Sequence, residues 1–319
     1  MTATATEPGA PPKPIKAKVR PGDRVFSTAA IAAGAVILAA LAAVAIFLIA
    51  EAMPAVGADT TGMNGNPDNL WAYVGPLAFG TVWSAALALL IALPISLGIA
   101  LFISHYAPRR IASGLGYVID LLAAVPSVIF GLWGVKVLAP AIVPLFDWLH
   151  QYFGWLPFFA GQVDSTGHTV LTVAVVLAVM IIPIITALSR EVFLQTPKLH
   201  EEAALALGAT RWEMIKMAVL PFGRPGVVSA TMLGLGRALG ETMVVAMLLS
   251  PALVINFVLT SGQNPSTIAG NIALQFPEAH GSAVNILIAT GLVLFIITLI
   301  VNSVARWVVS RRAAFSGAN

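Results

Sequence analysis

The chain has 319 residues, of which 58% are hydrophobic and only 10% are charged. Soluble domains carry about 25% charged residues, so the composition excludes an ordinary soluble protein. The formal net charge of +3 does not indicate a nucleic-acid-binding surface, because the basic residues flank apolar segments instead of gathering on one face. The chain contains no cysteine, which excludes disulfide and thiol chemistry.

Six apolar segments reach or approach the length of about 20 residues that a helix needs to cross a bilayer. In chain order they are Ser27–Ala50, Val74–Ser104, Leu115–Pro140, Thr169–Leu188, Pro225–Leu249 and Ala283–Val309. The alternating segments of about ten residues that are typical of membrane β-barrels do not occur. We therefore expect an all-α polytopic membrane protein, with six transmembrane helices in one membrane domain over residues 27–319.

Residues 1–26 precede the first segment and are rich in Pro, Thr, Ala and Lys, so we expect a disordered basic tail there. The first segment could also be a secretory signal ending near Ala50-Glu51-Ala52. Its apolar run exceeds the usual length of about 7–15 residues for a signal peptide, so we favour a retained helix.

The basic residues predict the orientation in the membrane. The loops at residues 51–73, 141–168 and 250–282 contain no Lys or Arg, whereas the tail, the loop at Arg109, the long loop at residues 190–224 and the C-terminal end are all basic. By the positive-inside rule, both termini and the long loop face the cytoplasm. We expect a multi-pass protein of the bacterial cytoplasmic membrane.

The loop at residues 190–224 has the pattern of a short helical hairpin. Thr196 is expected as the N-cap of its first helix, with Pro197 at the first helical position, where a missing N–H costs nothing. An apolar face then recurs at four-residue spacing, formed by Leu199, Ala203 and Leu207.

The end of this helix and the start of the next are also marked. Gly208 supplies a helix stop, and Thr210-x-x-Glu213 is a capping box that opens a second helix. An ordered hairpin with an apolar face suits docking of a helix into the groove of another protein. The alternative is an amphipathic helix that lies on lipid.

Two ionisable residues, Arg237 and Glu241, lie in the middle of the fifth segment, about 40° apart around a helix. A charge in mid-bilayer costs about 2.5–3.5 kcal/mol, so both side chains must face protein, water or each other. One interpretation is an internal ion pair that lets the helix insert. The other is that Arg237 lines the path of an oxyanion, which its planar fork binds bidentately, while Glu241 holds the guanidinium in place.

Three other features of the spans carry expectations. Gly236-x-x-x-Gly240 is expected to be a small-residue face for helix packing. Lys136, near the outer end of the third segment, either reaches the headgroups or draws anions toward the outer mouth. Asp120, near the cytoplasmic end of the same segment, is expected to have an interfacial or packing role.

The sequence shows no catalytic chemistry. The pattern G-x-x-x-x-G-K-[ST] of phosphate-binding loops is absent, so we expect no ATP site in this chain. The five histidines are scattered without the spacing of metal ligands. We therefore expect a protein that is not an enzyme and binds no metal or cofactor itself.

The hairpin also carries a family resemblance. Glu202-Ala203-Ala204-x-x-x-Gly208, followed by Leu220-Pro221, resembles the EAA motif of the membrane subunits of bacterial ATP-binding-cassette (ABC) importers, although Ala218 stands where the family usually has Ile. The resemblance implies the MetI-like permease fold and a coupling helix that sits in a groove of a separate ATPase subunit, where ATP and Mg bind. The implied coupling positions are Glu201, Glu202, Ala203, Ala204, Leu207 and Gly208.

Three further segments, at residues 80–110, 124–134 and 236–243, resemble the permeases of phosphate importers. The first carries His105 where relatives often have Glu, and the third is closer to the PstC branch than to the PstA branch. The resemblance implies that Arg237 and Glu241 line the path of inorganic phosphate. The implied partners are a PstB-like ATPase dimer, a PstA-like second permease and an extracytoplasmic phosphate-binding protein.

Two alternatives remain open. One Arg–Glu pair does not specify the anion, so the chain could be a permease for another oxyanion, such as molybdate or sulfate. The other alternative, from a different class, is an ATPase-independent secondary transporter or channel.

Overall fold

The computed structural model of the protein describes residues 21–58, 60, 63, 65, 67–249 and 252–313. The chain divides into two compact units, with the boundary between Phe47 and Leu48, inside helix α1 (Pro21–Ala52). The described residues of the first unit, 21–47, form most of α1. Residues 1–20 of the expected tail lie outside the described residues, whereas residues 21–26 already belong to α1.

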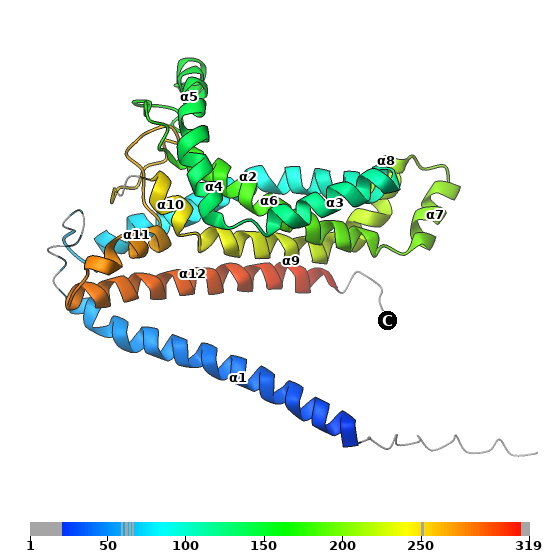
Figure 1. Ribbon diagram of the computed structural model, residues 1–319, viewed down its shortest axis with the longest axis horizontal. Coiled ribbons are helices and arrows are strands. Elements are labelled where there is room, and N and C mark those ends of the chain that lie inside the picture. Colours follow the sequence, from blue (N-terminus) through cyan, green and yellow to red (C-terminus); the bar gives the residue numbers. More distant parts are fainter. Residues whose placement is uncertain are drawn as a thin grey trace, which may run out of the picture. The chain divides into compact units, whose positions relative to one another are not determined.

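The second unit is helical throughout its named elements (Figure 1). After α1 they are η1 (Met53–Gly57), α2 (Leu70–Leu101), η2 (Phe102–Tyr106), α3 (Arg109–Ala123), α4 (Ser127–Trp133), η3 (Gly134–Leu138), α5 (Ala139–Phe153), α6 (Val170–Leu194), α7 (Lys198–Ala206), α8 (Arg211–Met214), η4 (Ile215–Val219), α9 (Leu220–Leu239), α10 (Met243–Leu248), α11 (Ile268–Gln275), η5 (Phe276–Glu278) and α12 (Ser282–Ala313).

The described residues contain six helices that are long and apolar enough to cross a membrane, as the sequence predicted. They are Gly22–Gly57, Leu70–Tyr106, Ser127–Phe153, Val170–Leu194, Arg211–Leu239 and Ser282–Trp307. Helices α2, α6, α9 and α12 run along a common direction, with α7 at one end of this bundle and α10 and α11 at the other (Figure 1).

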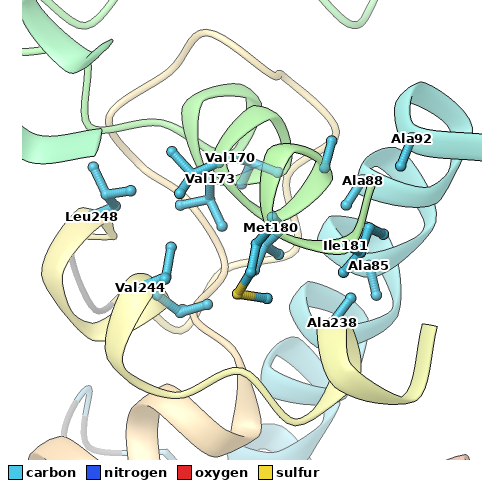
Figure 2. Close-up of a cluster of buried hydrophobic side chains, with 14 of the residues drawn as sticks. Ala85, Ala88, Ala92, Val170, Val173, Met180, Ile181, Ala238, Val244 and Leu248 are labelled. Atoms are coloured by element: carbon cyan, nitrogen blue, oxygen red, sulfur yellow. The ribbon is translucent and has the colours of Figure 1, made fainter. Parts of the chain in front are cut away.

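The core of the bundle is the contact between α2 and α6. Three small residues of α2, Ala85, Ala88 and Ala92, are fully buried and lie on one face of the helix. Figure 2 shows them beside Met180 and Ile181 of α6, which are buried as well. Small side chains let the two backbones approach closely, which is how helices associate in a medium as apolar as they are.

Glycines let the backbone of α9 approach the side chains of α6 closely. A Cβ atom at Gly226 would lie 2.4 Å from Val192 Cγ2, and one at Gly234 would lie 2.7 Å from the Ile185 side chain. The expected packing face Gly236-x-x-x-Gly240 is wrong for this chain. A Cβ at Gly236 meets no described atom within 4 Å, and Gly240 follows the end of α9.

The third span is not the single helix that was predicted over Leu115–Pro140. It breaks at residues 124–126, between α3 and α4, and the helix that resumes there runs on to Phe153. Pro126 explains the break, because proline has no N–H to donate and disfavours helical backbone in the residue before it. Asp120 is exposed on α3, and Lys136 is exposed in η3.

The fifth span also differs from its prediction over Pro225–Leu249. Elements α8, η4 and α9 form one continuous helix from Arg211 to Leu239, and α10 starts anew after a break at residues 240–242. Arg237 therefore lies in the last turn of α9. Glu241 lies in the break and not on the same helix.

Candidate functional site

The hairpin begins one residue later than predicted. Pro197 is the N-cap of α7, with extended backbone, and Lys198 is the first helical residue. Thr196 is only 3% exposed, and among the described residues its Oγ1 has no hydrogen-bond partner. The prediction of Thr196 as the N-cap is wrong because this side chain is enclosed by the protein instead of facing the helix N-terminus.

The predicted helix stop is confirmed at Gly208. Its φ of +87° is in the left-handed region that favours glycine. The N–H of Ala209 donates to the carbonyl of Ala204 at 3.2 Å, and the N–H of Gly208 donates to that of Leu205 at 3.0 Å. This pair of bonds is a Schellman motif, which satisfies the last carbonyls of α7.

The capping box is confirmed as well. The Thr210 hydroxyl accepts the N–H of Glu213 at 3.3 Å, and the Thr210 N–H donates to a Glu213 carboxylate oxygen at 2.8 Å. Both ends of the turn between α7 and α8 are thus fixed by local hydrogen bonds. The hairpin is held in one conformation by its own residues.

One side of α7 contacts the rest of the bundle. Ala204 packs against a buried cluster formed by the ends of α2 and α6 together with α8 and η4, which comprises Ala100, Phe193, Met214, Ile215 and Val219. On the same side, Glu201 forms an ion pair with His105 Nε2 at 3.5 Å, and these side chains are 23% and 8% exposed. The Ser104 hydroxyl lies 2.7 Å from the other ring nitrogen of His105.

Sequence reasoning missed this contact between α7 and η2. The signal that could have found it was His105 itself, which departs from the residue usual in the resembling family. Glu201 and His105 are far apart in sequence, so they meet only because the fold brings α7 against η2. The Glu201–His105 pair gives α7 a polar link to the second span in addition to the apolar contact of Ala204.

The other side of α7 is exposed. The side chains of Leu199 and Leu207 are 73% and 90% exposed. Glu202, Ala203 and Gly208 are exposed with them. The six predicted coupling positions therefore divide: Glu201 and Ala204 face the bundle, and the other four lie on a surface that no described residue covers.

A groove along α9 is the second candidate site. Its volume is about 680 Å³, and its lining comes from α6, α9 and α12. The lining residues are Ile184, Ser229, Met232, Leu233, Gly236, Arg237 and Asn302. Polar groups line it beside Arg237, because Ser229 and Asn302 contribute a hydroxyl and an amide.

Arg237 is half-buried in this groove, and no described residue forms a hydrogen bond or ion pair with its guanidinium. Glu241 is 8% exposed, and its carboxylate accepts the N–H of Val244 at 3.4 Å, in the first turn of α10. The ion pair between Arg237 and Glu241 does not form, and the expectation that Glu241 holds Arg237 in place is wrong. The carboxylate instead satisfies a free N–H at a helix N-terminus.

Ser229 and Asn302 were not predicted. Ser229 lies two turns before Arg237 on the same face of α9, a spacing that could have indicated it. Asn302 lies on α12, and only the packing of α12 against α9 places it on the groove. A lone asparagine near the end of a span carries no signal of its own in the sequence.

Fold and sequence together place the chain in a class. Residues 92–314 match the family described as "Binding-protein-dependent transport system inner membrane component", and the chain belongs to this family. It is a multi-pass protein of the cytoplasmic membrane. It is 45% identical over 315 residues to "Phosphate transport system permease protein PstC 2" of Mycobacterium tuberculosis, covering 94% of this chain and 97% of the relative.

A more distant relative gives the same result. The chain is 38% identical over 308 residues to "Phosphate transport system permease protein PstC" of Mesorhizobium japonicum, covering 93% of this chain and 92% of the relative. The resemblance to PstC-type permeases that was drawn from residues 80–110, 124–134 and 236–243 is thereby confirmed.

Solved structures confirm the predicted architecture. A crystal structure of a bacterial alginate ABC transporter, in complex with an alginate-bound periplasmic protein, contains a chain that matches with a TM-score of 0.62 at 18% identity. The match covers 93% of this chain and 97% of that one. A second structure of an alginate importer matches with a TM-score of 0.57 over 90% of this chain. The fold is that of an ABC importer permease.

Proposed function

We propose that this chain is the membrane-spanning permease subunit of an ATP-driven importer of inorganic phosphate. The observation that carries the proposal is the groove cation, Arg237, in a chain whose relatives are named phosphate transport permeases. A guanidinium fork matches two oxygens of a phosphate and stays charged at every physiological pH. The free-energy cost of placing the Arg237 guanidinium within a membrane span is offset when an anion binds it.

The missing partner of Arg237 is part of this proposal. A carboxylate paired to the guanidinium would compete with phosphate for the same donors. Glu241 is engaged by the N-terminus of α10 instead, which leaves the fork of Arg237 free for the substrate. Asn302 offers an additional amide donor from α12, whereas the Ser229 hydroxyl donates to the Pro225 carbonyl at 3.1 Å, so an anion in the groove has one neutral donor beside one cation.

The energy for transport comes from a separate subunit in this proposal. A PstB-like ATPase dimer, which binds ATP and Mg, docks on the exposed side of α7. Movement of α7 reaches the bundle through its two inward contacts, Ala204 against the buried cluster and Glu201 against His105. The chain itself binds no cofactor and catalyses no reaction.

Two more partners complete the proposed importer. A PstA-like second permease covers the open side of the groove, and an extracytoplasmic phosphate-binding protein delivers the anion to the outer loops. The positive-inside pattern supports cytoplasmic termini and a cytoplasmic α7. The outer loops, which lack Lys and Arg, are then the docking surface of the binding protein.

Uptake of radiolabelled phosphate by the reconstituted complex tests the role of Arg237. Arg237→Gln removes two charge-assisted hydrogen bonds of about 1.5–3 kcal/mol each, so uptake is expected to fall at least about 100-fold. The ATPase should still co-purify with the variant. Arg224→Gln, which removes an exposed cation of the same helix outside the groove, is the matched control and should leave uptake unchanged.

Normal phosphate uptake by Arg237→Gln would refute the substrate role of this residue. Competition by molybdate and sulfate separates the choice of anion from the role of the site. If an excess of either anion blocks uptake more strongly than unlabelled phosphate does, the importer serves another oxyanion. If uptake proceeds without ATP or an ATPase subunit, the chain is a secondary transporter or a channel.

A further inference from the structure

Helix α5 differs from the other long helices in its direction. It lies across the common direction of α2, α6, α9 and α12 (Figure 1), although it continues directly from η3 in the third span. The loop that follows it, residues 154–169, carries no Lys or Arg, which on the proposed topology places the end of α5 at the outer side of the membrane.

One face of α5 is packed, and a second face, about 120° away around the helix, is not. Ala139 and Phe146 are fully buried, and Ile142 is 7% exposed. These three positions are spaced by three and four residues, so they lie on one face of the helix. The packed face fixes the orientation of the helix about its own axis.

This second face bears a stripe of large apolar side chains. Leu145, Trp148 and Tyr152 follow each other at spacings of three and four residues and are 47%, 49% and 58% exposed. The Trp148 ring lies 5.4 Å from that of Tyr152 and 5.6 Å from that of Phe153, measured between centroids. Asp147 and Gln151, also exposed, lie beside this stripe and give the helix a polar side.

The stripe continues an apolar surface that belongs to the span. Ile129 and Leu132 on α4 and Val137 in η3 are 54%, 50% and 53% exposed. Side chains of this kind on a membrane span face lipid tails. The exposed surface therefore runs from the spanning part of the helix onto α5 without an intervening charged residue other than Lys136.

We propose that the Leu145–Tyr152 stripe of α5 lies in the outer headgroup region of the bilayer and anchors the broken third span there. Trp and Tyr collect at membrane interfaces, where the ring is in contact with acyl chains and the N–H or O–H reaches water. The direction of α5 is that of a helix in the plane of the interface, and its polar side faces the water. Because α5 carries no Lys or Arg, the anchor acts through apolar and aromatic contact and not through attraction to anionic lipid.

The anchor is also linked to α10. Helix α4 packs against α10, where a Cβ at Gly131 would lie 3.4 Å from the Val244 Cα. Val244 is the residue whose N–H binds Glu241. Holding α5 at the interface thus fixes α4 and, through it, the helix that engages Glu241. This part of the inference depends on the proposed topology.

The absence of cysteine makes a direct test simple, because each introduced cysteine is unique in the chain, which can be labelled before the complex is assembled. Trp148→Cys and Tyr152→Cys would each be spin-labelled and then measured in the permease complex, in vesicles of phosphatidylethanolamine and phosphatidylglycerol. Collision rates with oxygen, which concentrates among acyl chains, and with a water-soluble nickel chelate give the depth of each label. Asp147→Cys, on the polar side of the same helix, is the matched control.

Labels at positions 148 and 152 are expected to collide severalfold more with oxygen than with nickel, at a depth of about 5–10 Å below the headgroup boundary. The label at 147 should show the reverse ratio. Nickel access at 148 and 152 equal to that at 147 would overturn the proposal. Protection of both positions from both reagents would also overturn it, since that result means contact with a partner protein.

A second measurement avoids the labels. Lipids brominated near the headgroup quench tryptophan fluorescence. The quenching should fall more in Trp148→Phe than in Trp83→Phe, because the Trp83 ring is packed among other aromatic side chains. Equal loss in both variants would count against the anchor. Neither measurement involves phosphate, so the anchor and the phosphate proposal can fail separately.

Discussion

The hairpin around α7 and the groove around Arg237 are parts of one protein with opposite construction. In the hairpin, the polar groups at the turn are satisfied locally, by the Schellman motif at Gly208 and the capping box at Thr210. In the groove, the most costly polar group has no partner among the described residues. On the proposed function, the surface that fits the ATPase is rigid and complete, whereas the path that releases the anion keeps an unsatisfied charge.

This difference predicts that the two regions fail in different ways. Substitutions on the outer side of α7 should separate the permease from its ATPase and leave the affinity for anion unchanged. Substitutions in the groove should change the handling of anion and leave the ATPase bound. The following experiments test this separation.

The largest effect is expected from Leu199→Asp combined with Leu207→Asp. Burying each leucine in a partner groove is worth about 1.5–3 kcal/mol, so replacing both with carboxylates should weaken association with the ATPase at least about 100-fold. Co-purification of the ATPase with the permease measures the loss. Leu205→Asp, at a less exposed leucine of the same helix (44%), is the comparison, and an equal loss there would show that the docking side is misassigned.

Next in size is the effect of Asn302→Leu on anion handling. Loss of one neutral hydrogen bond to the anion is worth about 0.5–1.5 kcal/mol, which corresponds to roughly a 2- to 12-fold rise in the KM for phosphate-driven uptake. ATPase co-purification should not change. Ser303→Leu, at the adjacent exposed residue outside the groove lining, should have no such effect. An unchanged KM in Asn302→Leu would remove α12 from the path.

An effect of comparable size is expected for Gly208→Ala, because a side chain at φ +87° costs about 1–2 kcal/mol. The strain loosens the end of α7 and should raise amide hydrogen exchange in residues 198–207. Gly114→Ala on α3 is the control, since an added Cβ there meets no described atom within 4 Å. Unaltered exchange in the Gly208 variant would mean that the turn is not held by its own hydrogen bonds.

The smallest effect concerns the Glu201–His105 pair. Partly exposed ion pairs contribute about 0.2–1 kcal/mol, so a double-mutant cycle with Glu201→Gln and His105→Ala should give a coupling energy in that range. Hydrogen exchange of α7 in the two single variants and the double variant provides the measurement. Strictly additive effects would show that α7 depends on Ala204 alone for its contact with the bundle.

The sequence predicted those features that short-range chemistry determines. Gly208 and the Thr210–Glu213 capping box are local patterns with one structural outcome, and both were found as expected. Thr196 failed as an N-cap because a buried environment competes with capping, and burial is a property of the fold. The break at Pro126 was in reach of the sequence, since proline disfavours a helix that continues through it.

Of the residues that line the groove, only Arg237 was predicted from the sequence to lie on the substrate path. The energetic cost of Arg237 within a span indicated that it must face protein, water or substrate. The pairing with Glu241 assumed that one helix carries both residues, and the end of α9 at Leu239 removes that assumption. Asn302 joins Arg237 through the packing of α12, a long-range relation that no local spacing records.

The unbroken helix from Arg211 to Leu239 has a mechanical consequence. At a rise of about 1.5 Å per residue, Arg211 beside the hairpin and Arg237 beside the groove are separated by about 39 Å along a single rod. If the rod pivots near its middle, where glycines bring it against α6, a tilt of about 10° displaces each end by about 3 Å in opposite directions. A stroke of that size is comparable to the length of one hydrogen bond, so a lever of this kind could make or break the grip of the guanidinium on its anion with no other part of the chain refolding.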